Sequence, residues 1–375
     1  MQSNSLARRL EAELASGFIG REEEARVAVL ALLTRSHAVF IGEPGTAKSA
    51  LIRRLSQLVN CRFFYYLLNK YTVPDELIGA IDPIQYKQGK FVRNISGKLP
   101  QAELAFIDEV FKGSSETLNT LLNIINERVF VDADGTVYNC PLWSLYGASN
   151  ELPADSELAA FYDRFLLRHF VRRVDASQLE AAIIHNLTSN SSVKPIISLG
   201  DVQKLYDEVT AFMQSNASAL ARVTSQLVIV LRQNGIFVSD RTAVSPQYLP
   251  RLMATYHYCY GGDLRKAAIA VSKYVLPSEE SLEAYRKALD ALVPPELREA
   301  QEKLEKARDY AVSGDLASAK RFAAEAIQSA QALFAKPERI ELFKDELKEI
   351  IEGAEKLVKE ISSIEEKLKK FKRGD

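Results

Sequence analysis

The sequence predicts an α/β protein with a parallel sheet, followed by a region built from helices alone. Up to about residue 174, short apolar runs of strand length alternate with helical patterns of ten or more residues, as is typical of parallel βαβ units. After that point strand-like runs nearly disappear. Beyond Pro294 and Pro295 the composition turns to Ala, Glu, Lys and Leu at helical spacing, which indicates long antiparallel helices.

Length and composition set the class of protein. The 375 residues, 47% hydrophobic and 26% charged with a net charge of -1, are enough for about two to three globular domains of roughly 150 residues. A charge this close to zero gives no strong general affinity for polyanions. No run approaches the ~18 apolar residues of a membrane span. The cysteines, Cys61, Cys140 and Cys259, lack metal-ligand spacing, and no export signal precedes them, so we expect a reducing, cytoplasmic location.

The first elements expected are two helices and a strand. Helical spacing runs from Leu6 to Thr34, with breaks at Gly17 and Gly20, and the apolar run His37 to Ile41 follows as a strand. The next elements expected are a helix at Ala47–Leu58 and strands at Arg62–Leu68, Ala102–Ile107, Trp143–Ala148 and Val171–Asp175. Polar residues follow several of these strands, and ligands of parallel sheets bind beyond the carboxyl ends of the strands.

Further along, the chain divides into three predicted regions. An α/β domain covers 1–174, a small helical domain covers 175–280, and a helical hairpin or bundle covers 281–375. Between Gly79 and Pro100 the helical period is lost, and Lys87 to Lys90 resembles the tip of a hairpin. The expected tail helices are Glu296–Tyr310, Asp315–Phe334 and Glu338–Phe371. They suit a spacer or an oligomerisation element, and their sequence identifies no partner.

A phosphate-binding loop follows the first strand. Its residues are Gly42, Glu43, Pro44, Gly45, Thr46, Ala47, Lys48 and Ser49, and Ala50 continues into the next helix. The order of strand, glycine-rich loop and helix points backbone N–H groups at a bound phosphate. Lys48 would reach the β- and γ-phosphates, and the Ser49 hydroxyl would ligate Mg²⁺. The residue before the lysine is Ala47 where glycine is usual, which requires a negative φ at that position.

Two adjacent carboxylates end the strand Leu104 to Ile107. Asp108 is placed to hold Mg²⁺ through water, and Glu109 to act as general base on the attacking water. Either acid alone would also suit a helix cap. Together with the upstream loop, the pair favours a Mg-ATP hydrolase.

One amide and three arginines complete the candidate site. Asn150 ends the strand before it and would orient the lytic water without adding negative charge, although an isolated Asn there is usually a turn former. Arg164 follows a short helix and is a candidate finger for a neighbouring subunit's γ-phosphate. Arg168 is its rival, and a surface ion pair with Asp163 is the alternative for either. Arg241, beside the helix-capping residues Ser239 and Asp240, would contact the phosphates from the helical lid.

The order of motifs GEPGTAKS, LAFIDEV, YGASNELP, FYDRFLLR and VSDR resembles AAA+ ATPases of the MoxR family. The segments LNTLL and INER are most similar to the RavA branch, and the resemblance runs from about Leu6 to Ser278. It implies a hexameric ring with ATP at the subunit interfaces, a helical lid, and a hairpin insertion here at Gly79 to Lys98. It further implies that Phe18 and Ile19 lie on the adenine side, and that Lys48, Ser49, Asp108, Glu109, Asn150, Arg164 and Arg241 occupy the family's nucleotide, sensor and finger positions.

The resemblance also implies chaperone-like remodelling of a partner protein that carries a von Willebrand factor A (vWA) domain. The tail from about Pro294 does not resemble the β-containing module of RavA, so no decarboxylase partner is expected. Two alternatives stay open. A nucleic-acid motor would use the basic residues Lys87, Lys90, Arg93 and Lys98 of the insertion, but the net charge and the lack of a DNA-binding module oppose it. A nucleotide-gated scaffold would hydrolyse ATP slowly or not at all.

Overall fold

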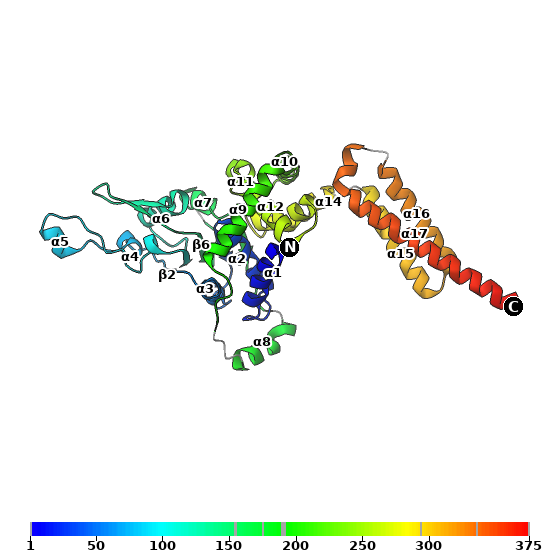
Figure 1. Ribbon diagram of the computed structural model, residues 1–375, viewed down its shortest axis with the longest axis horizontal. Coiled ribbons are helices and arrows are strands. Elements are labelled where there is room, and N and C mark those ends of the chain that lie inside the picture. Colours follow the sequence, from blue (N-terminus) through cyan, green and yellow to red (C-terminus); the bar gives the residue numbers. More distant parts are fainter. Residues whose placement is uncertain are drawn as a thin grey trace. The chain divides into compact units, whose positions relative to one another are not determined.

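The structure is a computed structural model that describes residues 2–153, 156–174, 176–188, 193–292, 295–334 and 337–373 (Figure 1). The chain forms two compact units, Met1–Tyr285 and Arg286–Asp375. The first unit holds the sheet and most of the helices, and the second holds helices alone. This agrees with the predicted fold class.

A parallel sheet of five strands, in the order β2-β3-β6-β1-β7, organises the first unit. The strands are β1 (Ala38–Ile41), β2 (Phe63–Leu67), β3 (Leu104–Asp108), β6 (Ser144–Ser149) and β7 (Leu167–Phe170). Ile41 pairs with Ser149, and Ile107 pairs with Gly147. The carboxyl ends of β1, β3 and β6 therefore lie at one edge of the sheet. Strands β1 and β6 are buried along their whole length, as expected for a parallel sheet with both faces covered.

The helices of the first unit cover this sheet and continue after it. Their bounds are α1 (Gln2–Ala15), α2 (Glu22–Thr34), α3 (Lys48–Val59), α4 (Pro74–Ile78), α5 (Pro83–Lys87), α6 (Ser115–Glu127), α7 (Ser156–Tyr162), α8 (Ala176–Thr188), α9 (Leu199–Ser215), α10 (Ala217–Gln233), α11 (Asp240–Val244), α12 (Leu249–Tyr260) and α13 (Leu264–Ser272), with short 3-10 turns at Leu99–Gln101 and Lys273–Val275. Helix α14 (Ser281–Leu292) includes the division between the two units at residue 285. After Phe170 the described residues contain no strand.

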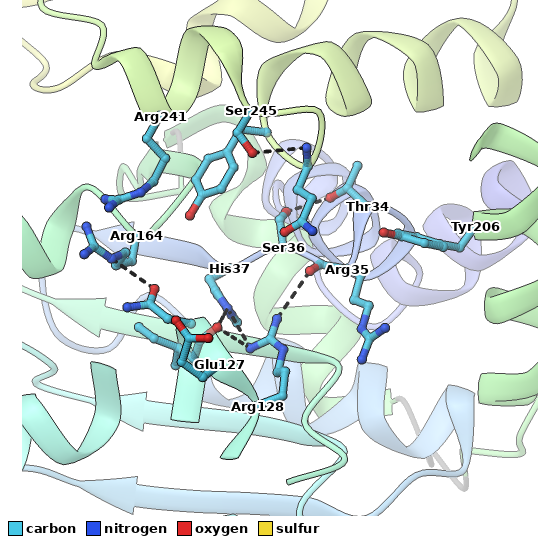
Figure 2. A pocket seen from close by; sticks show the side chains of 14 residues that line it. Thr34, Arg35, Ser36, His37, Glu127, Arg128, Arg164, Tyr206, Arg241 and Ser245 are labelled. Atoms are coloured by element: carbon cyan, nitrogen blue, oxygen red, sulfur yellow. Dashed lines mark hydrogen bonds between the residues drawn. The ribbon is translucent and has the colours of Figure 1, made fainter. Parts of the chain in front are cut away.

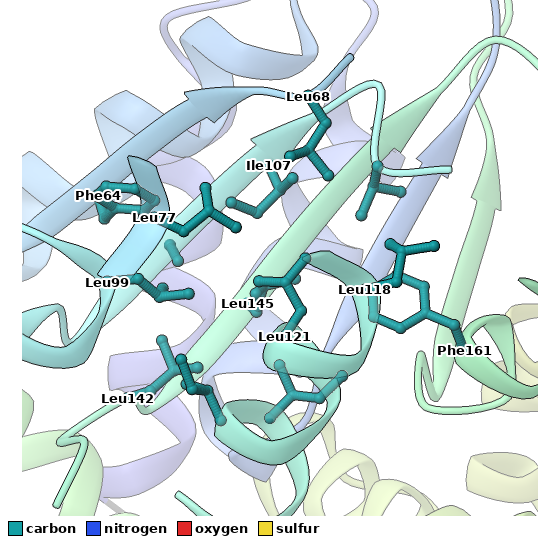
Figure 3. Close-up of a cluster of buried hydrophobic side chains, with 14 of the residues drawn as sticks. Phe64, Leu68, Leu77, Leu99, Ile107, Leu118, Leu121, Leu142, Leu145 and Phe161 are labelled. Atoms are coloured by element: carbon teal, nitrogen blue, oxygen red, sulfur yellow. The ribbon is translucent and has the colours of Figure 1, made fainter. Parts of the chain in front are cut away.

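One large apolar cluster fixes the sheet against its helices (Figure 3). Ile107 and Leu145 project from the central strands onto Leu121 of α6, while Phe161 of α7 closes one side. Each fully buried side chain of this size contributes about 1.5–3 kcal/mol relative to leaving it exposed. The packing holds the carboxyl ends of β1, β3 and β6 in fixed positions.

The predicted strand at Val171–Asp175 is wrong. The strand is β7, which ends at Phe170, and one further contact follows, in which Val171 N donates to Ile41 O at 2.7 Å. The next residues, Arg172 and Arg173, lie outside the sheet, and their side chains pair with Glu279 and Glu43. Asp175 lies outside the described residues.

The insertion differs from the expected hairpin. Its two arms run antiparallel and pair at a single bridge between Ile81 and Arg93, and its tip is the short helix α5. Asp82 caps this helix by accepting hydrogen bonds from Ile84 N and Gln85 N at 2.8 and 3.2 Å. A capping Asp followed by a proline at the first helical position is a helix-start signal.

A second, unpredicted pair of strands lies between α6 and β6. Strands β4 (Val129–Val131) and β5 (Val137–Asn139) form an antiparallel hairpin. The pair Asp134–Gly135 stands at its tip, with Gly135 at φ 84°, and Asp-Gly between apolar residues is a hairpin signal. Arg93 of the insertion reaches this hairpin and pairs with Asp132 at 2.7 Å.

The second unit is built from α15 (Pro295–Ser313), α16 (Leu316–Phe334) and α17 (Pro337–Arg373). They match the long helices that the sequence predicts there. Between α15 and α16, Gly314 adopts φ 85° and Asp315 accepts a hydrogen bond from Ser318 N at 3.1 Å, so this turn ends one helix and caps the next. Alanines such as Ala307 and Ala323 fill the interface. Pro294 lies outside the described residues.

Candidate functional site

The glycine-rich loop connects β1 to α3 at the carboxyl edge of the sheet. A side-chain carbon at Gly42 would lie 2.3 Å from Val171 O, so only glycine fits there. Gly45 adopts φ 79° and has open space around it, which leaves the loop accessible from outside. Helix α3 begins at Lys48, and its first N–H groups face the loop, as in a phosphate site.

The expectation of a negative φ at Ala47 is wrong. Ala47 adopts φ 64° and ψ 16° at the position that caps α3. The chain enters the helix directly from the loop, and this turn requires the left-handed region that glycine usually occupies. An L-residue there costs about 1–2 kcal/mol, so the loop holds local strain of the kind that gathers at functional sites.

The ammonium group of Lys48 is held inside the glycine-rich loop by oxygen atoms of the loop. Its ammonium donates to Gly42 O at 2.8 Å, to Glu43 O at 2.7 Å and to Thr46 Oγ1 at 3.2 Å. Burial lowers the pKa of Lys48, while the nearby carboxylates of Asp108 and Glu109 oppose this shift. The loop thus carries a partly desolvated cation at the point where phosphate charge would need neutralising.

Asp108, the last residue of β3, and Glu109, which follows it, lie beside this cation. Burial raises the pKa of Asp108, and the hydrogen bond from Glu109 N to Asp108 Oδ1, at 3.1 Å, opposes the rise. Glu109 adopts φ 51°. Its Oε1 accepts a hydrogen bond from Asn150 Nδ2 at 2.9 Å, and its Oε2 lies 3.1 Å from Lys112 Nζ. Residues 41 positions apart in the chain therefore meet beside the loop.

The segment before α2 lies next to the same edge. Phe18 and Ile19 are half-buried, and Arg21 Nη1 donates to Arg172 O at 2.7 Å. A cavity of about 510 Å³ is lined by Gly20, Arg21, Arg173 and others. Arg173 in turn pairs with Glu43 of the loop. The residues from Val171 to Arg173 thus have the glycine-rich loop on one side and the Phe18–Gly20 segment on the other.

Arg164 and Arg241 lie elsewhere (Figure 2). Both line a cavity of about 590 Å³ that also contains His37, the residue immediately before β1. Arg164 Nε donates to Asn126 Oδ1 at 3.0 Å, and Arg241 Nη1 pairs with Asp163 Oδ2 at 3.1 Å. The loop follows the opposite end of β1, about 13 Å away for a strand of four residues. Within one chain, the structure does not bring either arginine to the loop.

Arg168 is placed differently from Arg164. It is 5% exposed, donates to Val275 O at 3.2 Å, and lies 4.5 Å from the centre of the Tyr162 ring. Its second guanidinium nitrogen is 3.5 Å from Asp163 Oδ1, and burial lowers its pKa. Arg168 therefore positions the Asp163 side chain inside the chain.

Two further arginines of this cavity were missed by sequence reasoning. Arg35 and Arg128 end α2 and α6 with φ 53° and 58°, and both side chains line the cavity. Burial lowers the pKa of Arg128 to about 10, and Arg35 adds to the shift. The INER segment contains Arg128, yet a basic residue at a helix end carries no signal that separates a capping role from a binding role.

A parallel sheet with a glycine-rich phosphate loop after β1 and paired acids at the end of β3 is consistent with an AAA+ ATPase fold. Comparison with known proteins agrees. The sequence model for the MoxR domain of MoxR-vWA-beta-propeller ternary systems matches residues 5–206. This is more than half of the chain, which therefore belongs to the MoxR family of AAA+ ATPases.

Relatives and solved structures extend this result. Two uncharacterised proteins of Methanocaldococcus jannaschii are 41% and 40% identical over 234 and 237 residues, 62% of this chain in both cases. The chain spans about three fifths of their length, 61% and 60%. The chaperone MoxR1 of Mycobacterium tuberculosis is 23% identical over half of each chain. The crystal structure of a candidate ATPase from Cytophaga hutchinsonii shares the fold, with a TM-score of 0.62 and 18% identity over 77% of this chain and 94% of that one. Among the helices described, none has the length and apolar character needed to cross a membrane.

Proposed function

We propose that this chain hydrolyses ATP at the loop Gly42–Ser49 and uses the energy to remodel a protein partner. The hydrogen bond between Asn150 and Glu109 carries the proposal. It places a carboxylate and a neutral amide together at the carboxyl edge of the sheet, where the glycine-rich loop begins. Glu109 would then accept the proton of the attacking water, and Asn150 would orient the water and the Glu109 carboxylate.

Mg²⁺ and ATP fit the residues at this edge. Lys48 is held within the loop by 2.7–2.8 Å bonds to carbonyl groups and offers a cation to the β- and γ-phosphates. Ser49 and Asp108 are the oxygen ligands for Mg²⁺, a cation that prefers oxygen and usually keeps several waters. Bound Mg²⁺ would neutralise charge on the phosphates. The side of the site next to Phe18 and Ile19 is assigned to adenine.

The arginines complete the site from a second copy of the chain. Arg164 and Arg241 share a cavity with His37, beyond the amino end of β1 in their own chain, so they are free to meet the phosphates of a neighbour. A head-to-tail interface of this kind closes into a ring, and a hexamer is our proposal. Burial of Arg168 supports Arg164 as the finger.

The partner we propose is a protein with a vWA domain, and we place the chain in the RavA-like branch. The matching family is defined by ternary systems that contain a vWA component, and a relative is named as a chaperone. The insertion gives little support to a DNA motor, because Arg93 is 9% exposed and pairs with Asp132 and Asp75. A cytoplasmic location is proposed from the three free cysteines, two of them buried.

Steady-state ATP hydrolysis tests this function. We expect Mg-dependent turnover that a vWA-domain protein from the same organism stimulates and single-stranded DNA does not. Glu109→Gln protein loaded with ATP should retain that vWA protein at ~150 mM salt, whereas Lys48→Ala protein should not. Stimulation by DNA alone, with submicromolar ATP-dependent DNA binding, would instead establish a nucleic-acid motor.

A further inference from the structure

Helix α8 has an apolar face whose side chains are at least half exposed among the described residues. Leu179, Ile183 and Leu187 recur at intervals of four residues on one face, and Ile184 lies beside them. Their exposed fractions run from 51% for Ile183 to 81% for Leu187, and no described residue of α8 is buried. Glu180 is the only Asp, Glu, Lys or Arg in the helix. A nearly uncharged helix with such a face suits an apolar groove.

The first unit also contains an apolar groove between α9, α10, α11 and the start of α12. Its volume is about 790 Å³. Met213, Leu220 and Val228 form its buried floor, and Ile229 and Val244 stand at its rim with exposed fractions of 53% and 75%. The charged groups at the rim already have partners in the chain. Arg232 pairs with Asp240 at 2.7 Å, and Arg251 lies 3.9 Å from the centre of the Tyr206 ring.

The helix and the groove belong to opposite sides of the proposed subunit interface. Helix α8 follows the segment that Arg173 ties to Glu43 of the nucleotide loop, and its Gln178 lines the cavity beside Gly20. The groove instead adjoins the arginine cavity, since Tyr206 and Gln247 line both. Consider one chain whose Arg164 and Arg241 reach the glycine-rich loop of a neighbouring chain. The α9–α12 groove of the first chain then faces the side of the neighbour that carries helix α8.

We propose that α8 of one chain docks by Leu179, Ile183 and Leu187 in the α9–α12 groove of the next chain in the ring. The inference rests on the proposed function, because the arginines set the direction of the interface. Each chain then presents one helix and one groove, so the contact is heterologous and repeats around a ring. Assembly would bury both apolar surfaces at the same time as it completes the nucleotide site.

Cysteine cross-linking between two full-length variants tests the contact. Ile183→Cys protein and Val244→Cys protein should form a disulfide-linked dimer when mixed and oxidised, at least tenfold more than either variant alone. The matched control is Ala181→Cys with Val244→Cys, because Ala181 is exposed on the far side of α8. The native thiols compete little, since burial raises the pKa of Cys61 and Cys259 to about 12 and that of Cys140 to about 11.

Several results would overturn the docking. Equal cross-linking in the test and control mixtures would show that α8 does not enter the groove. A chain carrying both Ile183→Cys and Val244→Cys that oxidises only within the monomer would show that its own helix fills the groove.

A second pair of variants separates this contact from ATP chemistry. Ile183→Asp should raise the protein concentration needed for half-maximal turnover at least tenfold, while ATP affinity in the monomer stays within twofold of the unmodified chain. Ala181→Asp should change neither. If the two variants assemble equally well, the docking is wrong although hydrolysis stands. If the unmodified chain neither binds nor hydrolyses ATP while the cysteine variants cross-link as expected, the proposed function fails and the contact remains.

Discussion

The two ends of strand β1 carry opposite kinds of chemistry. The carboxyl end leads into a loop with one cation, Lys48, and lies beside the acids Asp108 and Glu109. The amino end opens into a cavity with four arginines and Glu127 (Figure 2). We propose that the first end holds a nucleotide and activates water, while the guanidiniums near it, Arg21 and Arg173, are already paired with Glu24 and Glu43. The amino end of β1 has four guanidiniums but no phosphate-binding loop. This contrast supports the proposal that the two ends are halves of one site, shared between neighbouring chains.

The two ends of β1 also differ in where residues with positive φ occur. Arg35 and Arg128 adopt positive φ where helices end, which is common at helix C-termini. Ala47 caps the start of a helix, and Glu109 follows a strand, yet both adopt positive φ. Because neither Ala47 nor Glu109 ends a helix, their positive φ angles are not explained by helix termination. The strain at the nucleotide end therefore coincides with the residues proposed to bind and activate, as backbone strain often does.

The largest expected effects distinguish the two neighbouring arginines. Arg164→Ala should lower kcat by about 10³–10⁵, the range known for arginine fingers, with the free energy of unfolding nearly unchanged. Arg168→Ala should instead destabilise the fold by about 1.5–3 kcal/mol, because it removes a buried charged hydrogen bond to Val275 O, while Asp163 keeps Arg241 as a partner. Turnover and urea denaturation of both variants would check this. A loss of rate in Arg164→Ala that follows a loss of folded protein would remove it from the site.

Binding and turnover should separate at the nucleotide end. Glu109→Gln is expected to lower kcat by about 10²–10⁴, the usual contribution of a positioned base, and to retain ATP. Lys48→Ala should abolish ATP binding because it removes the cation of the loop. Isothermal titration compares the two, with Lys204→Ala as a surface control. Unchanged affinity in the Lys48 variant would show that the phosphates bind elsewhere.

The arginine end should make stability depend on pH. His37 Nδ1 accepts a hydrogen bond from Leu145 N at 2.9 Å, and burial holds the pKa of His37 well below 6.5. Below pH 6.5 the unfolded chain takes up a proton that the folded chain refuses, so stability falls as pH falls, by up to about 1.4 kcal/mol per pH unit. Urea denaturation at pH 7.5 and 5.5 measures this. His37→Gln should remove most of the slope.

The smallest effect concerns the strained loop. Ala47→Gly should stabilise the fold by about 0.5–1 kcal/mol, since glycine adopts φ 64° without the steric cost but makes the unfolded chain more flexible. Ala50→Gly, in the first turn of α3, should destabilise it by up to about 1 kcal/mol. Thermal unfolding of the two variants shows whether each substitution stabilises or destabilises the fold. The same sign in both would show that the loop is not strained at Ala47.

The residues that meet at the carboxyl end of β1 could be predicted from the sequence because their signals are local. The glycine loop after an apolar strand and the acids after β3 are short motifs, and parallel strands bring their ends together. The arginine end depends on tertiary contacts. Arg128 meets His37 across 91 residues, and no local pattern reports such a contact. The β4–β5 hairpin and helix α5 do have local signals, the Asp134–Gly135 turn and the Asp82–Pro83 cap.

Subunit mixing tests most directly whether the two ends of β1 form one site between neighbouring chains. Arg164→Ala subunits keep the loop, and Lys48→Ala subunits keep the finger, so about a quarter of interfaces in an equal, random mixture would be complete. We predict turnover in the mixture well above that of either variant alone. A mixture of Lys48→Ala and Glu109→Gln, both damaged at the nucleotide end, should show no such gain. Turnover equal to the average of the two separate variants, together with rates per chain that do not depend on protein concentration, would contradict a shared site.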